Sequence, residues 1–297
     1  MHNRSESSKK DSKFKGLTCI KGGGSKAVTR VLSFTSGKGG VGKTNCVVNV
    51  AIALARMGRS VAVLDADLGL ANINVLLGLK PTYTIHDVLS GAHLLEEIIL
   101  DGPEGIAIIP AASGIQAACD LSTEQRLTLM QSLENFAYDF DYLLIDTQAG
   151  IGSEVMFFNS ASSEIVCVIN NEPTSLTDAY ALIKILSREY GERDFSILAN
   201  NVDGRRAGEA AFGRLCRVVD RFLQVDLKYL GCIPADASVN AAIMEQRAVL
   251  QSYPSSPAAL ALDALARRLD DNFHERRIKG GMQFFFKQLL DVNAYDR

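Results

Sequence analysis

The sequence predicts an α/β protein with a single doubly wound, mostly parallel sheet flanked by helices. Three observations carry this prediction. Short apolar runs such as VAVLD, YLLID and IVCVI are typical of strands that are covered on both faces. Helix-length stretches separate these runs over about 240 residues, which favours parallel crossovers within one domain. The composition, with 47% hydrophobic and 22% charged residues among 297, suits a globular chain with a large core.

The expected strands and helices alternate along the chain. We expect strands at 31–35, 61–65, 106–110, 142–146, 165–170, 195–200 and 228–233. We expect helices at 43–57, 122–136, 176–190, 209–222, 238–246 and 257–273. Because no internal linker or repeat interrupts this alternation, we predict one domain over residues 29–273.

The two ends of the chain differ in composition from this domain. Residues 1–28 are rich in Ser, Lys and Gly, which predicts a flexible basic leader. Residues 1–30 carry a charge of +6, so the remainder carries −9. Residues 274–297 combine a basic stretch with MQFFFKQLLDV, whose apolar residues other than Phe284 fall on one helical arc. This helix is too short to span a bilayer, but residues 282–292 suit either a membrane surface or the surface of their own domain.

Charge, apolar runs and cysteine usage limit the cellular compartments and the binding partners that the chain could have. The leader lacks the apolar stretch of a signal peptide, and no run reaches about 18 apolar residues. We therefore expect a cytoplasmic protein, peripheral at most on the inner face of the cell membrane. The six Cys include no CxxC pair, which disfavours structural zinc and, in a reducing compartment, disulfides. A net charge of −3 disfavours DNA binding by the whole surface.

The strongest motif follows the first expected strand. Residues 36–44 read SGKGGVGKT and match the phosphate-binding pattern GxxxxGK[ST] between a strand and a helix. In this pattern the backbone N–H groups surround the phosphates, Lys43 reaches the β and γ phosphates, and the Thr44 hydroxyl binds Mg²⁺. The sequence therefore predicts a site for ATP and Mg²⁺. Its loop residues are Gly37, Lys38, Gly39, Gly40, Val41, Gly42, Lys43, Thr44 and Asn45.

Three carboxylates are expected at the same edge of the sheet. Asp65 and Asp67 end the second strand, and Asp146 ends another. Open α/β sheets bind ligands at the carboxyl ends of their strands. A single Asp at a strand end is more often a turn residue, but three beside a phosphate loop favour a role at the nucleotide.

The loop carries a second lysine, Lys38, and the run KGGVGKT resembles the deviant Walker A motif of the MinD/ParA family of ATPases. The resemblance implies an ATP-dependent homodimer in which Lys38 contacts the nucleotide of the partner subunit. It also implies that Asp146 holds the water shell of Mg²⁺ and that the Gly150 N–H faces the γ phosphate. Asp67 then orients the attacking water, and Asp65 supports the metal shell. The implied catalytic residues are Lys38, Lys43 and Asp67, and the implied metal residues are Thr44, Asp65 and Asp146.

The same resemblance indicates a base pocket and shows two departures from the family pattern. Asn200 ends a strand where relatives hold adenine, and Pro234 lies in the stretch 233–235 that supplies backbone contacts. Asn200 fits a strand-end turn residue equally well. Gln148 stands in DTQAG where relatives usually have Pro, so φ is not fixed there. Asn45 replaces the commoner Thr or Ser.

Longer strings resemble the flagellar-number regulators of bacteria, the FleN/FlhG branch. They are SGKGGVGKTN, LDADLGLANINVLLGL, IIPAASGIQ, NEPTSLTDAYALIK and FLQVDLKYLGCIPAD, and the resemblance covers about residues 29–290. It implies a slow, regulatory ATPase whose dimer restrains a flagellar master transcription activator of the AAA+ type. It also implies that the protein acts together with a polar GTPase of the signal-recognition type. The leader lacks the DQAxxLR-like motif with which some members stimulate that GTPase, so the resemblance does not extend to stimulation.

Two other functions compete with this interpretation. A ParA-type partitioning ATPase coats DNA through a basic surface, whereas the body of this chain clusters basic charge only at 205–206, 267–268 and 276–277. An electron-transfer reductase of the nitrogenase iron-protein type needs Cys pairs that hold an iron–sulfur cluster. Cys119 and Cys167 do not lie in the Gly-rich loops that such a cluster requires. The partitioning ATPase is therefore the stronger alternative.

Overall fold

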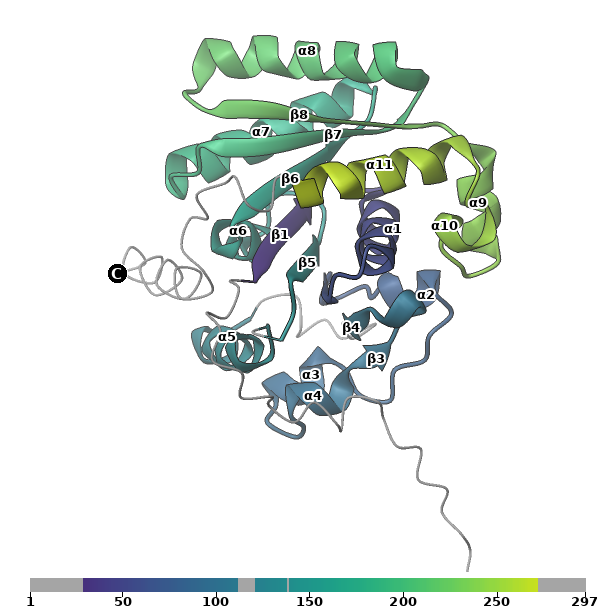
Figure 1. Ribbon diagram of the computed structural model, residues 1–297. Coiled ribbons are helices and arrows are strands. Elements are labelled where there is room, and N and C mark those ends of the chain that lie inside the picture. The colour runs from purple at the N-terminus through teal and green to yellow at the C-terminus, as the bar shows by residue number, and fades with distance from the viewer. Residues whose placement is uncertain (1–28, 112–120, 138, 272–297) are drawn as a thin grey trace, which may run out of the picture.

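A computed structural model describes residues 29–111, 121–137 and 139–271 (Figure 1). The predicted leader at 1–28 lies outside the described residues. So does the predicted C-terminal segment at 274–297, with its amphipathic helix.

One eight-stranded sheet organises the described chain. Its strands are β1 (Arg30–Thr35), β2 (Val61–Ala66), β3 (Leu100–Asp101), β4 (Ala107–Ile109), β5 (Tyr142–Thr147), β6 (Glu164–Ile169), β7 (Asp194–Val202) and β8 (Asp226–Pro234). They lie in the order β3-β4-β2-β5-β1-β6-β7-β8, and all neighbours are parallel except β3 and β4. The predicted doubly wound, mostly parallel sheet is confirmed, and only the two-residue β3 was not expected.

The predicted helices are all present, and further helices were not predicted. The predicted ones are α1 (Lys43–Arg56), α5 (Thr123–Ala137), α7 (Pro173–Glu189), α8 (Gly204–Phe222), α9 (Ala237–Met244) and α11 (Pro257–Asp271). α7 begins three residues earlier than expected, because Pro173 suits the first helical position. α8 begins five residues earlier, at a glycine with positive φ. The missed helices are α2 (Ile73–Leu76), α3 (Ile85–Leu89), α4 (Leu95–Ile98), α6 (Ser153–Ala161), α10 (Val249–Ser252) and the 3₁₀ turn Pro103–Gly105.

Side chains of the strands alternate between two helical layers. In β1, Leu32 and Phe34 pack with residues of α1 and α11, whereas Val31 packs with residues of α5 and α6 on the other face. α1 and α11 lie side by side (Figure 1), and α7 and α8 cover the second face beyond β6. Because both faces are covered, the strands read as continuous apolar runs rather than as alternating ones.

The strand order brings three loops to one edge of the sheet. β1 lies between β5 and β6, and β2 lies on the far side of β5. Asp65 of β2 and Asp146 of β5 are directly paired in register. The loops that follow β1, β2 and β5 therefore leave the sheet together at its carboxyl edge, where open α/β sheets bind their ligands.

Candidate nucleotide-binding site

The phosphate loop joins β1 to α1 and depends on glycine at defined positions. Gly40 and Gly42 have φ of 76° and 85°, which side-chain-bearing residues rarely adopt. A Cβ on Gly37 would lie 2.3 Å from the carbonyl of Asp178 in α7, and one on Gly42 would lie 2.3 Å from Nδ2 of Asn200. Glycine thus allows the loop to pack against α7 on one side and against the end of β7 on the other.

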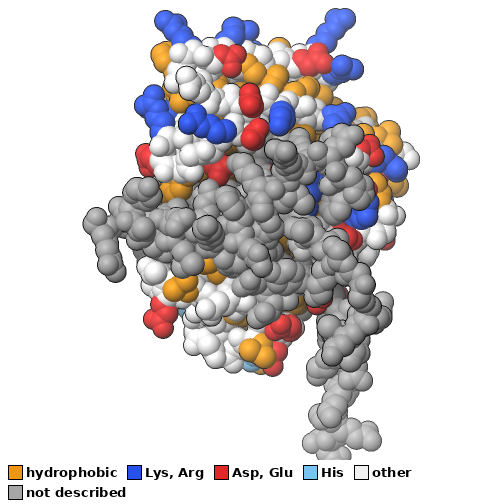
Figure 2. Space-filling model, turned by 60° about the vertical axis from the view of Figure 1, so that its left-hand side comes forward, with side chains coloured by type: hydrophobic (Ala, Val, Ile, Leu, Met, Phe, Trp, Pro, Cys, Tyr) orange, Lys and Arg blue, Asp and Glu red, His pale blue; other side chains and the backbone are white. Residues whose placement is uncertain are grey.

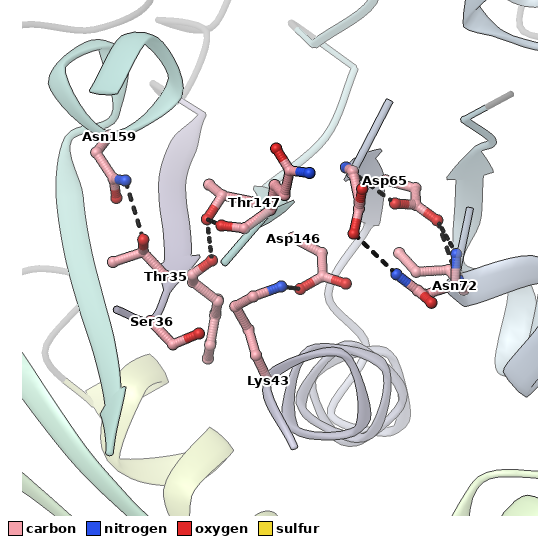
Figure 3. Close-up of polar contacts among 12 residues, drawn as sticks. Thr35, Ser36, Lys43, Asp65, Asn72, Asp146, Thr147 and Asn159 are labelled. Carbon is pink, nitrogen blue, oxygen red and sulfur yellow. Dashed lines mark hydrogen bonds and ion pairs between the residues drawn. The ribbon is translucent and has the colours of Figure 1, made fainter. Parts of the chain in front are cut away.

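Lys43 pairs with Asp146 inside the site. Lys43 is the first residue of α1, and its Nζ lies 2.5 Å from Oδ1 of Asp146 (Figure 3). Only 8% of Lys43 and none of Asp146 is exposed. The other oxygen of Asp146, Oδ2, is buried without a hydrogen-bond partner. A phosphate that binds Lys43 therefore releases a carboxylate that has a free oxygen for a cation.

Asp65 organises the loop that follows β2. Its two oxygens accept N–H groups from Asp67 at 3.2 Å, Asn72 at 2.9 Å and Ile73 at 3.0 Å (Figure 3). Burial and then the neighbouring Asp146 carboxylate raise the pKa of Asp65 to about 7, although the N–H groups act in the opposite direction. Both oxygens of Asp65 are thus engaged by the backbone. This arrangement suits a supporting role rather than a direct metal contact.

Asp67 presents a free oxygen within the same loop. Its Oδ2 accepts a hydrogen bond from Nδ2 of Asn72 at 3.1 Å, whereas its Oδ1 is buried without a partner. Burial raises the pKa of Asp67, while the Lys43 charge acts to lower it. One oxygen is therefore positioned by the protein, and the other has no partner within it.

The oxygen donors at this edge fit Mg²⁺. Thr44 lies half-buried in the first turn of α1, and the unpartnered oxygens of Asp67 and Asp146 lie in the same buried site. Hydroxyl and carboxylate oxygens are the ligands that Mg²⁺ prefers, and it is usually held by one or two of them together with water and substrate phosphates. Among the described residues no group of three or more His, Cys, Asp or Glu side chains is placed to hold a metal alone. The site thus suits a cation that arrives with a nucleotide.

Lys38 contacts α7 rather than the buried carboxylates. Its ammonium group forms an ion pair with Glu172 and donates a hydrogen bond to Oγ1 of Thr174 at 3.0 Å. The hydrogen bond and charge of Lys38 lower the pKa of Glu172. About a third of the Lys38 side chain, 35%, is exposed. The two lysines of the loop therefore contact different parts of the molecule.

The loop after β5 is tied to the phosphate loop. The Gly150 N–H, which the family resemblance places opposite the γ phosphate, donates to the carbonyl of Ser36 at 2.9 Å. Thr147 Oγ1 lies 3.1 Å from the Phe34 carbonyl and 3.0 Å from that of Gln148 (Figure 3). The hydroxyl of Thr147 thus holds the backbone at Gln148, where relatives usually have proline. A γ-phosphate contact by Gly150 requires the bond to Ser36 to be exchanged.

A cavity of about 230 Å³ adjoins the phosphate loop. Asn200 and Pro234, the two residues predicted for a base pocket, both line it, together with Asn45. Their contact with a base stays a prediction. Asn200 Nδ2 donates to the Val41 carbonyl at 2.7 Å, so this side chain also braces the phosphate loop. Asn240 and Ile243 of α9 also line the cavity and were not predicted. No local motif marks them, because only the packing of α9 brings them to the site.

Asn159 of α6 supports the end of β1 and was also missed. It accepts a hydrogen bond from Ser33 Oγ at 2.8 Å. It also donates one to Thr35 Oγ1 at 3.1 Å, which Figure 3 shows. Asn159 is fully buried, so these bonds are shielded from water. They hold the strand from which the phosphate loop emerges.

Comparison with known proteins identifies the family. Residues 27–270 match the model of the ParA family, described as NUBPL iron-transfer P-loop NTPase. Antiactivator FleN of Pseudomonas aeruginosa is 46% identical over 271 residues, which are 91% of this chain and 97% of the relative. Flagellum site-determining protein YlxH of Helicobacter pylori is 34% identical, over 89% of this chain and 91% of the relative.

Solved structures agree with this assignment. MinD of Pyrococcus horikoshii, complexed with Mg-ADP, is 28% identical with a TM-score of 0.66 and covers 83% of this chain and 98% of its own. A chain of the MinC:MinD complex of Aquifex aeolicus is 26% identical with a TM-score of 0.69, and the match covers 82% of this chain and 96% of its own. This chain belongs to the MinD/ParA family of P-loop NTPases, in its FleN/FlhG branch.

Proposed function

We propose that this chain is an ATP-dependent dimerising switch that hydrolyses ATP slowly and limits flagellar number. The observation that carries the proposal is the separation of the two loop lysines. Lys43 is buried and forms an ion pair with Asp146, whereas Lys38 lies at the rim of the site and forms an ion pair with Glu172. The similarity to antiactivator FleN and to YlxH supports the flagellar setting.

The described residues suit hydrolysis of ATP to ADP and phosphate. Lys43 and the loop N–H groups bind the β and γ phosphates, and Thr44 and Asp146 would hold Mg²⁺. Bound Mg²⁺ supplies positive charge that balances the phosphate oxygens. Asp67, with one oxygen fixed by Asn72 and one unpartnered, orients the water that attacks the γ phosphorus. We expect slow turnover, because positioning of this water by one carboxylate is the main chemical assistance.

The rim of the site suits a second copy of the chain. Leu70 is 66% exposed in the loop after β2, and Ile151 is 53% exposed in the loop after β5. Lys38 lies at the same rim, and its contacts with Glu172 and Thr174 are on the surface, where ion pairs exchange partners at little cost. In the proposed dimer, Lys38 leaves these partners and contacts the nucleotide of the other subunit.

Size-exclusion chromatography with ATP and with ADP tests the switch. We expect the wild-type chain to elute as a dimer with ATP and as a monomer with ADP. Asp67→Ala is expected to remain dimeric with ATP and to release no phosphate, because the water loses its orienting carboxylate. Normal hydrolysis by Asp67→Ala would overturn the role of Asp67, and an elution volume independent of nucleotide would overturn the switch.

The partners form a finer part of the same proposal. We expect the ATP-bound dimer to restrain a flagellar transcription activator of the AAA+ type and to work with a polar signal-recognition-type GTPase. Within the described ranges, no helix combines the length and the apolar run that a bilayer crossing needs. Peripheral membrane binding through residues 282–292 is tested by co-sedimentation with liposomes. Equal binding with ATP, with ADP and by a chain that ends at Lys279 would overturn it.

One surface feature keeps a ParA-type DNA-partitioning function as the second candidate. Helix α8 exposes five arginines, which are Arg205, Arg206, Arg214, Arg217 and Arg221. Figure 2 shows Lys and Arg side chains around the upper end of the molecule, where α8 lies, with Asp and Glu side chains among them. DNA retention that requires ATP and weakens with salt would favour this second function. We expect no such retention, because the chain beyond residue 30 carries a charge of −9.

A further inference from the structure

A buried donor without a partner lies in the first turn of α1, in a residue that lines the nucleotide cavity. Asn45 is 8% exposed, and it lines the cavity beside Gly40, Val41 and Gly42 of the phosphate loop. Its Nδ2 is buried and makes no hydrogen bond within the protein. An unpaired buried N–H donor costs free energy unless a ligand accepts its hydrogen bond.

The neighbouring hydrogen bonds determine which end of the Asn45 amide is left unpaired. The Leu250 N–H donates to Oδ1 of Asn49 at 3.0 Å. A backbone N–H can only donate, so Asn49 must present its oxygen to Leu250 and its NH₂ to Asn45. That NH₂ group donates to the Asn45 carbonyl at 2.9 Å and to Asn45 Oδ1 at 3.0 Å. The Asn45 oxygen is therefore engaged, and its NH₂ group is the end left without a partner.

The far end of this chain of bonds holds helix α10. Leu250 is bound at both backbone groups, because its carbonyl accepts a hydrogen bond from Arg56 Nη1 at 3.1 Å. Asn49 is completely buried, and Val249 and Leu250 belong to the core under α1. The bonds thus run without a break from the nucleotide cavity, through α1, to the backbone of α10.

We propose that Asn45, Asn49 and the Leu250 N–H form a polarised relay that presents an N–H donor to a phosphate oxygen of the nucleotide and couples its binding to α10. Asn45 is the binding residue, and Asn49 is a positioning residue that acts through it. This inference rests on the proposed ATP site. It adds a residue, Asn49, that never touches the nucleotide.

Asn49→Asp tests the direction of the relay. The new carboxylate still accepts the Leu250 N–H but cannot donate to Asn45. Asn45 must then turn its NH₂ group inward and its oxygen toward the phosphates. We expect Mg-ATP and Mg-ADP to bind roughly 10- to 100-fold more weakly in calorimetric titrations, the range expected for a lost hydrogen bond to a charged group. Wild-type affinity in a folded Asn49→Asp chain would overturn the relay.

Two further variants separate this role from simple packing. Arg56→Gln removes the other bond to Leu250 without touching Asn45, and we expect its nucleotide affinity to stay within about twofold. A loss equal to that of Asn49→Asp would show that loosening α10 alone weakens binding, which overturns the relay. In an Asn45→Ala background, Asn49→Asp is expected to cause no additional loss, since it acts only through Asn45. An additional loss of about tenfold or more would overturn the positioning role.

Amide hydrogen exchange supplies a readout that does not depend on affinity. At saturating Mg-ATP we expect the Leu250 N–H to exchange more slowly than in the free protein. The Tyr190 N–H, which bonds to the Leu186 carbonyl at the end of α7 and lies outside the relay, serves as the internal control. Unchanged exchange at Leu250 would overturn the coupling to α10. Failure of the wild-type chain to bind ATP would instead overturn the proposed nucleotide site itself, and the relay with it.

Discussion

The inner and outer sides of the phosphate loop each hold a lysine–carboxylate pair, in very different surroundings. On the inner side, Lys43 and Asp146 are almost completely buried. On the outer side, 35% of the Lys38 side chain and 55% of the Glu172 side chain are exposed. Breaking a buried ion pair leaves an uncompensated buried charge, whereas a surface ion pair contributes little to folding stability. The inner lysine is therefore fixed until phosphate arrives, and the outer lysine is ready to change partners.

Removal of the inner lysine should have the largest effect. We expect Lys43→Ala to abolish ATP binding, because the phosphates lose their main cation. It should also lower the free energy of unfolding by about 3 kcal/mol, because Asp146 remains buried without its partner. Calorimetric titration and urea denaturation measure the two effects. Unchanged stability would show that burial does not distinguish the two pairs.

Removal of the outer lysine should affect assembly alone. We expect Lys38→Ala to change the free energy of unfolding by less than about 1 kcal/mol and to retain ATP binding by the monomer. Dimerisation with ATP should be lost, as sedimentation velocity would show. Glu172→Gln is the matched control, because it frees Lys38 without removing it and should preserve the dimer. Dimers of Lys38→Ala would remove the proposed contact between subunits.

The smallest expected effect is on the pH dependence of stability. Asp65 on the inner side and Glu172 on the outer side should change the free energy of unfolding in opposite directions as the pH rises. Folded Asp65 keeps its proton to about pH 7, whereas an unfolded Asp releases it near 3.8, so its contribution to stability falls as pH rises between these values. Glu172 has a lowered pKa, so its small contribution is lost as pH falls below its ordinary 4.5. Urea denaturation of the nucleotide-free chain between about pH 4.5 and about pH 7.5 measures the slope. Asp65→Asn should make the slope of the free energy of unfolding against pH less negative. An unchanged slope would contradict the raised pKa of Asp65.

Prediction from the sequence succeeded where the signal is local. The phosphate loop occupies nine consecutive residues, 36–44, and its strand and helix flank it directly. The apolar strands are equally local, since burial on both faces leaves a continuous run in the sequence. Helix α6 was missed because residues 154–161 are buried on all sides and show no helical periodicity. Asn240 and Ile243 were missed because no motif accompanies them.

The sequence by itself determined the doubly wound sheet, the phosphate loop and the strand-end carboxylates, because each is written in residues that are neighbours along the chain. The tertiary structure alone decided which partners these residues have. Lys38 meets Glu172 across 134 residues, and Asn49 meets Leu250 across 201. Such pairs leave no local pattern, because they arise only when helices far apart in the sequence pack against the same sheet edge. That packing directs one lysine of a single loop inward and the other toward the rim.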